Sequence, residues 1–423
     1  MVVVKFGGTA MLQHPYDALS RIMGCWKRNQ PVVVVVSAIA GVTDALLDGN
    51  VAGVRKILKQ WQRENHVPTR CCASVSEMLS FCDRCSSRAS AKNLLVSMGE
   101  KISAVLLCAM MQHPYSPMRG APVWADVDVI SLCNGEWLCN SANIERCRDR
   151  HLIPVVTGFC ARDVITGATR LLGRNGSDTT ATLLAKELKE DCVIFSDVPG
   201  IMTADPRICK SAVPIRLLTF SEVRELAFHG ASVLHGKCVE FAEKNVGRRL
   251  IVAHVSDCAW RRNGTVIAST LDLGEGHENI VAVAVLQHRV GISVRAERGV
   301  PGFACSVFQK VCDAGVSVEM FSQTCSETSI CLVVPAERQQ DVEVALRDFS
   351  VTVTEELAIV TVVGEGMQST PGVAGCVCEQ LGDFDINIRS ISQGASETSL
   401  SVAVSESDAL QAVRAVHDII VTQ

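Results

Sequence analysis

The 423-residue sequence has no long run of lysine and arginine, and its formal net charge is −5. Nucleic acid and anionic membranes are therefore not expected as partners, because both select for basic patches. The longest apolar run near the start, residues 32–36, is far shorter than the roughly 18 residues of a membrane-spanning helix. Lys5 and Gly7-Gly8 also interrupt the stretch where a secretory signal would need an unbroken apolar core. A cytoplasmic location is expected.

Metal-binding and disulfide patterns are scarce, although the sequence contains 20 cysteines. A chain without an export signal is expected to keep its thiols reduced. Cys108 and Cys331 lie in apolar segments, where cysteine acts as a small hydrophobic residue. Cys82 and Cys85 form one C-x-x-C, but no second pair follows at zinc-ribbon spacing. Helix packing is the favoured interpretation of this pair and a metal or redox role is the alternative, so no metal site is predicted.

Two familiar nucleotide-binding motifs are absent. Residues 230–237 approach the phosphate-loop pattern, but five residues separate the glycines and Cys238 replaces the serine or threonine. No complete G-x-G-x-x-G follows a strand, since "GEG" at 364–366 lacks the third glycine. A phosphate site in this chain has to use another loop.

Apolar segments alternate with helical patterns in the first part of the chain. Helices are expected at 101–111 and 177–188, and the expected strands are 2–6, 32–37, 123–127, 153–157, 193–196 and 250–255. This alternation predicts an α/β fold in which helices sandwich an open, mainly parallel sheet. Ligands of such sheets bind beyond the carboxyl ends of the strands.

Three glycine-containing segments occupy such strand ends. "KFGG" closes the first strand, "SAIAGVT" begins at Ser37, and "SDVPGIMTADPR" begins at Ser196. Together they predict an anion cradle that includes Lys5. The simpler alternative for the first segment is a tight turn after a strand.

Residues 173–188, "GRNGSDTTATLLAKEL", carry the densest chemistry. Apolar residues at helical spacing place a helix start near Ser177 or Asp178. Its free N–H groups suit an anion, whereas an ordinary helix cap is the alternative. Arg174 can bind a carboxylate with two parallel hydrogen bonds, and Asp178 can hold an ammonium group. This pairing fits an α-amino acid.

Glu100 allows two interpretations. With Ser97 it forms a capping box, which predicts a helix start. A carboxylate at the head of an apolar helix could instead bind a substrate amine.

An internal repeat follows residue 290. Residues 299–334 and 369–404 align with a constant offset of 70, which matches Pro301 with Pro371 and Gln323 with Gln393, and residues 326–328 with 396–398 (both "SET"). Each copy predicts a β-α-β-β-α-β unit. Such a pair binds a ligand or pairs with a copy of itself, and a dimerisation device without a ligand is the alternative.

In this order, the motifs resemble an aspartokinase over nearly the whole chain. The matching segments are "KFGGT", "VVSAIAGVTDALL", "MGEKISA", "GRNGSDTTATLLA", "FSDVPGIMTADPR" and "ELAFHGASVLH", and the repeats resemble ACT domains. The resemblance implies an amino-acid-kinase catalytic domain at 1–265, a linker and first ferredoxin-like ACT domain at 266–355, and a second ACT domain at 356–423.

The resemblance implies a feedback-regulated enzyme. With ATP and Mg²⁺ it would phosphorylate the side-chain carboxylate of L-aspartate to 4-phospho-L-aspartate, the first step toward lysine, threonine and methionine. One alternative is a paralogue with a weakened kinase site that senses amino acids as a regulatory subunit. Another is a different amino-acid kinase, such as a glutamate kinase, which the paired repeats disfavour.

The resemblance also implies roles for individual residues. Lys5 and Asp178 would be catalytic, with Lys5 stabilising the transferring phosphoryl group. Glu100 would bind the aspartate ammonium and Arg174 its α-carboxylate. The substrate would also meet Ser37, Thr43, Asn175, Gly176 and Ser177. The nucleotide would lie along Lys5, Phe6, Gly7, Gly8, Ser196, Asp197, Met202, Arg207 and Lys237.

Several positions depart from the family pattern. Asn175 replaces a glycine of R-G-G-S-D, and Met202 stands where tyrosine is usual. Ser232 and Gly236 replace a lysine and a proline of the motif FGAKVLHP, and Lys237 stands five residues after Ser232. These changes leave room for weak ATP binding.

The repeats suggest how the enzyme would be regulated. Gln323 and Gln393 match in the two copies, and a primary amide can meet either end of an amino acid. A strand-end glutamine facing water is the alternative. The pair resembles the threonine-sensitive aspartokinases, so threonine is the first expected effector and lysine the second. A homodimer or larger assembly through the ACT domains is expected, because paired chains would cover exposed strand edges.

Overall fold

The computed structural model describes residues 1–65, 70–85, 92–112, 117–133, 136–173, 175–230, 234, 236–269, 280–296, 301–324, 328–394 and 396–422. The chain forms two compact units. The first unit contains Met1–Ile201, Pro214–Phe220 and Val233–Leu273. The second contains Met202–Val213, Ser221–Ser232 and Gly274–Gln423.

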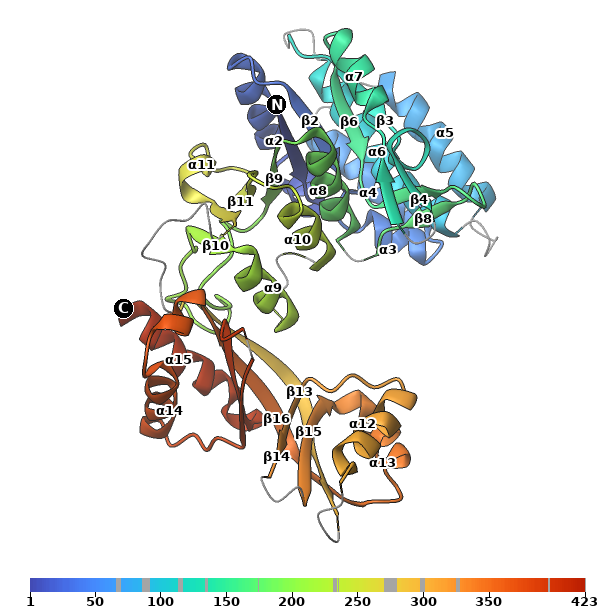
Figure 1. The fold of residues 1–423 in the computed structure, drawn as a ribbon. Helices are drawn as coiled ribbons and strands as arrows, with labels where there is room; N and C mark the ends of the chain where they lie inside the picture. The colour runs from blue at the N-terminus through green and yellow to red at the C-terminus, as the bar shows by residue number, and fades with distance from the viewer. Residues whose placement is uncertain are drawn as a thin grey trace. The chain divides into compact units, whose positions relative to one another are not determined.

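In the described part of the first unit, one sheet has the strand order β10-β12-β11-β9-β1-β2-β6-β3 (Figure 1). Its strands are β1 (Val2–Phe6), β2 (Val32–Val36), β3 (Gly120–Val123), β6 (Ile153–Thr157), β9 (Asp191–Ser196), β10 (Leu217–Thr219), β11 (Leu250–His254) and β12 (Thr265–Ala268). Neighbouring strands run parallel, except for the antiparallel pair β11 and β12. The predicted open, mainly parallel sheet is confirmed.

The apolar strands β1 and β2 bury both faces. Val2, Val4 and Phe6 belong to a core shared with the helices that follow in sequence. Side chains alternate along a strand, so Lys5 points to the opposite face, where helix α8 (Gly176–Leu188) lies. Lys5 pairs in register with Val35 of β2 and Ile194 of β9, which places it near the carboxyl edge of the sheet.

Helices surround this sheet. The others described in the first unit are α1 (Gly8–Gln13), α2 (Pro15–Lys27), α3 (Val42–Leu47), α4 (Val51–Glu64), α5 (Arg70–Cys85), α6 (Lys92–Met111), α7 (Ala142–Asp149), α10 (Gly236–Glu243) and α11 (Trp260–Asn263). Among the described helices, α6 alone is long and apolar enough to cross a membrane, and 89% of its apolar window is buried inside the structure. This burial is the environment of a core helix.

Two local predictions were wrong, and one sheet was not predicted. The capping box of Ser97 and Glu100 does not start a helix, because both residues lie inside α6 and the Ser97 hydroxyl donates to the Leu94 carbonyl (2.8 Å). The strand expected at 123–127 ends at Val123, and Ala125–Val129 form a π-helical turn. A second sheet of the first unit was not predicted; its described strands are β4 (Ile130–Cys133), β5 (Glu136–Cys139), β7 (Cys160–Asp163) and β8 (Thr169–Leu171).

The second unit contains an antiparallel sheet, whose described strands follow the order β14-β15-β13-β16-β18-β17 (Figure 1). They are β13 (Ala282–Arg295), β14 (Met320–Gln323), β15 (Ser329–Pro335), β16 (Ser350–Val363), β17 (Ser390–Gln393) and β18 (Ser399–Ser405). The helices are α9 (Phe220–Phe228), which begins one residue before this unit, α12 (Phe303–Asp313), α13 (Gln339–Ala345), α14 (Val373–Asp383) and α15 (Ala409–Thr422).

The repeats form two lobes that share the long strands β13 and β16. In the first lobe, residues 289–295 pair with 350–357, beside α12 and α13. In the second lobe, residues 282–286 pair with 359–363, beside α14 and α15. In the sequence, the first lobe thus lies between two strand segments of the second lobe, residues 282–286 and 359–363. The domain limits at 265 and 355 stay predictions, and residue 355 lies within β16.

Candidate active site

A cavity of about 250 Å³ lies at the carboxyl ends of β1, β2 and β6. Its lining includes many residues singled out by the sequence, together with two that were missed. The lining residues are Lys5, Gly8, Ser37, Ala38, Thr43, Glu100, Phe159, Asn175, Gly176, Ser177 and Asp178. Segments from five separate parts of the sequence therefore meet in one place.

A buried ion pair joins strand β1 to helix α8. The Lys5 Nζ atom lies 2.6 Å from Asp178 Oδ1, and the two side chains are 12% and 6% exposed. Burial strengthens this attraction and restricts the ammonium to one direction. The pair therefore holds a cation ready beside the cavity.

The amino terminus of α8 also faces the cavity. Asn175 precedes the helix with φ +52°, a left-handed conformation that asparagine tolerates better than most residues. A Cβ on Gly176 would lie 2.8 Å from the Phe159 ring, so close packing requires glycine there. The first-turn N–H groups and the helix dipole favour an anion at this end.

Glu100 supplies a buried carboxylate from α6. It is 3% exposed, and its Oε1 atom accepts a hydrogen bond from the Ala38 N–H (3.3 Å). Within the described part of the chain, Oε2 is buried without a hydrogen-bond partner. Burial raises the Glu100 pKa to about 8. A buried carboxylate with a free oxygen is suited to a ligand cation, which would lower that pKa.

A second buried ion pair neighbours Glu100. Lys101 Nζ lies 3.0 Å from Asp126 Oδ2, which also accepts a hydrogen bond from the Thr169 hydroxyl (2.9 Å). The Lys101 charge lowers the Glu100 pKa and the Asp126 charge raises it, but burial outweighs both. Lys101 is thus paired with Asp126, and the Glu100 carboxylate stays available to a ligand.

The loops after β1 and β2 pack tightly, which explains the glycine at position 8. The Gly7 N–H donates to the Phe195 carbonyl (3.2 Å), and Ala40 donates to the Gly8 carbonyl (3.2 Å). A Cβ on Gly8 would lie 2.5 Å from the Ala38 carbonyl oxygen, so no larger residue fits. The Phe6 side chain is buried in the core and stacked on Phe195 (5.3 Å), so only the Phe6 backbone can meet a nucleotide.

The remaining predicted nucleotide residues do not line this cavity. Ser196 ends β9, and its hydroxyl donates to Asp197 Oδ1 (3.0 Å). Lys237 lies exposed in the first turn of α10. Met202 and Arg207 belong to the second unit, where Arg207 pairs with Asp205 (2.6 Å).

Other predicted residues lie elsewhere. Gln323 and Gln393 end strands β14 and β17 and are exposed. Arg174 and Ser232 fall outside the described residues.

Phe159 is a lining residue that the sequence analysis missed. It has φ +69°, which is strained for a bulky side chain, and its N–H donates to the Thr180 hydroxyl (3.2 Å). Its position in the sequence could have identified it, because Gly158-Phe159 directly follows the buried strand 153–157 at the ligand-binding edge.

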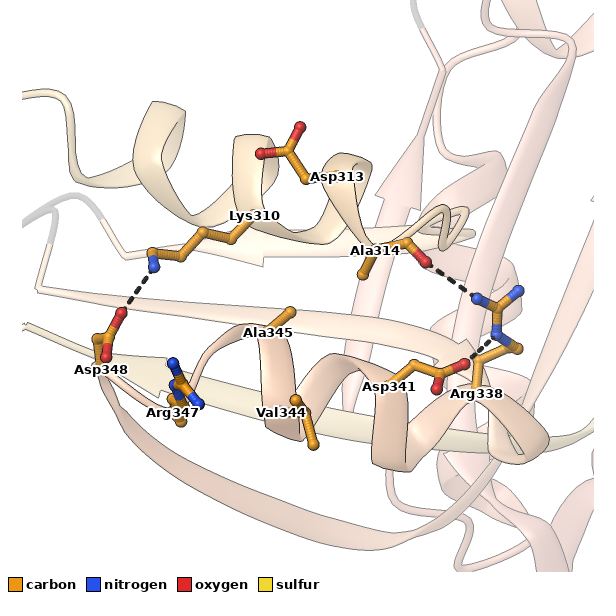
Figure 2. Close-up of a pocket in the computed structure, with 9 residues that line it drawn as sticks. All are labelled: Lys310, Asp313, Ala314, Arg338, Asp341, Val344, Ala345, Arg347 and Asp348. Atoms are coloured by element: carbon orange, nitrogen blue, oxygen red, sulfur yellow. Dashed lines mark hydrogen bonds and ion pairs between the residues drawn. The ribbon is translucent and has the colours of Figure 1, made fainter.

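A larger hollow of about 720 Å³ lies on the first lobe, between α12 and α13. Figure 2 shows Lys310 turned toward Asp348 (2.7 Å) at one end and Arg338 toward Asp341 (2.7 Å) at the other. Arg338 also donates to the Ala314 carbonyl (3.2 Å). No polar atom of the residues in Figure 2 is buried without a partner, unlike Glu100 in the smaller cavity. Size alone therefore does not identify the reactive site.

Known families match both parts of the chain. Residues 1–254 match the Amino acid kinase family, and residues 291–348 and 360–419 match the ACT domain. The aspartokinase of Geobacillus stearothermophilus is 30% identical over 99% of this chain and 96% of its own length. The aspartokinase of Helicobacter pylori strain J99 is 30% identical over 99% of this chain and 98% of its own length.

Solved structures agree. Escherichia coli aspartokinase III in complex with aspartate and ADP has a TM-score of 0.74 at 26% identity, over 99% of both chains. Clostridium acetobutylicum aspartate kinase has a TM-score of 0.81 over 99% of both chains, and at 21% identity it supports the fold alone. This chain belongs to the amino acid kinase family and, within it, to the aspartokinases.

Proposed function

We propose that the cavity at Lys5 transfers the γ-phosphoryl group of ATP to the side-chain carboxylate of L-aspartate, giving 4-phospho-L-aspartate and ADP. One observation carries the proposal: the cavity joins a buried carboxylate with a free oxygen, a buried lysine and a helix amino terminus. These groups complement an ammonium group and several anionic oxygens. No finding favours the alternative of a regulatory paralogue with a weakened site.

The substrate would bind with its ammonium on Glu100 and its α-carboxylate toward the first turn of α8, with Arg174 assigned by resemblance. Ser37 and Thr43 would line the path to the phosphate. The side-chain carboxylate then attacks the γ-phosphorus, a new O–P bond forms, and the bond to the bridging oxygen of ADP breaks. Lys5 would stabilise the charge that spreads over the transferring oxygens. The nucleophile belongs to the substrate, so none is required from the protein.

The nucleotide and its metal complete the proposal. The Escherichia coli enzyme was crystallised with ADP, which supports a nucleotide here. It would extend from Lys5 and the backbone of Gly7-Gly8 toward Ser196 and Asp197, with Met202, Arg207 and Lys237 assigned by resemblance. The described residues contain no group of three or more His, Cys, Asp or Glu side chains that could hold a metal. We therefore propose that Mg²⁺ is bound chiefly through the phosphate oxygens.

The reaction is tested with the purified full chain, L-aspartate and MgATP. ADP is measured by a coupled assay, and the acyl phosphate is trapped with hydroxylamine. We expect equal amounts of both products, and their loss when EDTA removes Mg²⁺. ADP release without hydroxamate, or the same rate with L-glutamate, would contradict the proposal.

Replacing Lys5 with alanine should lower kcat at least 100-fold, because one electrostatic contact to the transition state typically contributes that much. Lys244→Ala is the matched control, since Lys244 is 54% exposed and pairs only with its helix neighbour Glu240 in the described contacts. Circular dichroism confirms that both variants fold. A folded Lys5→Ala enzyme with near-normal turnover excludes the proposed role of Lys5.

Binding of aspartate should depend on the ionisation of Glu100. Its pKa is raised to about 8, and only the carboxylate form pairs with the substrate ammonium. KM for aspartate should therefore fall as the pH rises from 6.5 to 8. Glu100→Gln should raise KM about 10- to 100-fold and remove this pH dependence, as expected for a lost hydrogen bond to a charged group. A wild-type KM for aspartate that is constant across this pH range would contradict the proposed role of Glu100.

An amino-acid effector is the proposed role of the ACT lobes. Escherichia coli aspartokinase III was crystallised with lysine and aspartate, whereas the glutamine pair here favours threonine first and lysine second. Gln323→Ala should weaken inhibition by the effector 5- to 150-fold, the usual range of allosteric coupling. Gln309→Ala is the control, because that exposed glutamine of α12 pairs with Asp313 (2.8 Å). Activity titrated against each amino acid decides, and no inhibition by either at millimolar concentration refutes the proposal.

A homodimer through the ACT lobes also remains a proposal. Phe321 on edge strand β14 and Ile391 on edge strand β17 are 52% and 49% exposed, and both lie two residues before the paired glutamines. Covering these edges would remove apolar surface from water. Light scattering should give twice the chain mass, and a monomer at micromolar concentration would contradict it.

A further inference from the structure

We propose that the second ACT lobe holds the loop 202–213 in place and that His417 of helix α15 is a positioning residue for nucleotide binding. The inference rests on the proposed function for the assignment of Met202 and Arg207 to the nucleotide. All contacts cited for the loop lie within the second unit.

Residues 202–213 form a closed loop. The Thr203 N–H donates to the Val213 carbonyl (2.9 Å), and the Val213 N–H donates to the Thr203 hydroxyl (3.1 Å). The loop leaves and rejoins the first unit through Ile201 and Pro214. These two hydrogen bonds therefore fix the two ends of the loop to each other.

His417 bridges two hydroxyl groups of this loop. Its Nε2 atom lies 2.9 Å from Thr203 Oγ1, and its Nδ1 atom lies 3.4 Å from Ser211 Oγ. The residue is 1% exposed, and burial lowers its pKa although the Asp418 charge opposes this. A neutral imidazole has one donor and one acceptor, which two hydroxyl groups can satisfy together.

Further contacts seat the loop on the lobe. The Arg414 side chain donates to the Ile208 carbonyl (3.1 Å), and the Val283 N–H of β13 donates to the Thr203 carbonyl (2.9 Å). Ala204 and Cys209 are each 4% exposed and belong to the hydrophobic core of the second lobe. Thr203, Ala204 and Cys209 thus anchor the loop in the lobe, while Arg207 and Val213 stay exposed.

The sheet of the first unit explains why this loop bears on the nucleotide. Strand β9 runs parallel to β1 with Phe195 opposite Phe6, so it ends at the same edge where Lys5 lies. Ser196 and Asp197 follow at that edge, and the chain reaches the loop at residue 202. The described residues that line the aspartate cavity all belong to the first unit. A loop that is held less firmly should therefore weaken ATP binding and leave aspartate binding unchanged.

The same lobe holds a second segment that precedes Lys237. In α9, Glu222 accepts a hydrogen bond from the Glu365 N–H (2.9 Å), and Glu225 accepts one from the Ser399 hydroxyl (2.9 Å). His229 lies 3.1 Å from the Thr361 hydroxyl of β16. The helix that precedes Lys237 in the sequence is thus held by the same lobe, whereas Lys237 itself lies in α10 of the first unit.

The test measures KM for both substrates in the full-length enzyme. His417→Leu removes both hydrogen bonds, His417→Gln can keep the one to Thr203, and Ser211→Ala removes only the longer one. Val311→Ala is the control, because Val311 is 1% exposed in the separate core of the first lobe. We expect His417→Leu to raise KM for ATP about 10-fold, as two lost hydrogen bonds imply, with kcat and KM for aspartate within twofold. His417→Gln should restore most of the lost ATP affinity, because it can keep the hydrogen bond to Thr203.

A folded His417→Leu enzyme with an unchanged KM for ATP overturns the inference. Equal increases in both KM values, shared by Val311→Ala, overturn it as well, because they indicate general destabilisation. If wild type has no kinase activity, the proposed function fails instead. ADP titration calorimetry still decides the present inference: weaker binding by His417→Leu supports it, and equal binding refutes it.

Discussion

The ion pair between Lys5 and Asp178 is the contact on which the rest of the site depends. It joins the carboxyl edge of the central sheet to the first turn of α8, so the strand and the helix amino terminus face one cavity. The glycine at position 8 lets the loops after β1 and β2 close around this point. A cation fixed by a buried carboxylate needs little reorganisation when phosphate charge develops, which is the property that phosphoryl transfer demands.

Glu100 supplies the complementary charge. Its burial is unfavourable for the empty protein, since the free carboxylate oxygen has lost water without gaining a described partner. Lys101 is paired with Asp126 Oδ2, so the Glu100 oxygen is left to a ligand, and Asp126 Oδ1 is likewise buried without a described partner. The cavity therefore combines a carboxyl group that a bound ammonium can ionise with a lysine and a helix amino terminus, as an amino acid with an attacking carboxylate beside a phosphate donor requires.

Features encoded locally were predictable from the sequence. The apolar strands at 2–6, 32–37, 153–157, 193–196 and 250–255, the helix after Asn175 and the internal repeat each have a clear local pattern, and the structure contains them. Features decided by distant contacts were not. Ser97 looks like a cap but lies in a buried helix, and the strand expected at 123–127 gives way to a π-helical turn at 125–129. The burial of Thr203, Ala204 and Cys209 in the second lobe depends on partners far away in the sequence, such as His417.

The contact between the loop 202–213 and the second ACT lobe is the proposed link between regulation and chemistry. The loop 202–213 follows β9, which ends at the sheet edge where Lys5 lies, and its residues Ala204 and Cys209 belong to the core of an ACT lobe. We therefore expect a change in that lobe to reach the loop through these packed side chains.

The most direct measurement is a crystal structure of the full chain with L-aspartate and a non-hydrolysable ATP analogue. We expect the substrate ammonium within about 3 Å of Glu100 and the terminal phosphate within about 3 Å of Lys5. Aspartate bound elsewhere, such as in the hollow between α12 and α13, or a terminal phosphate remote from Lys5, would contradict the central claim.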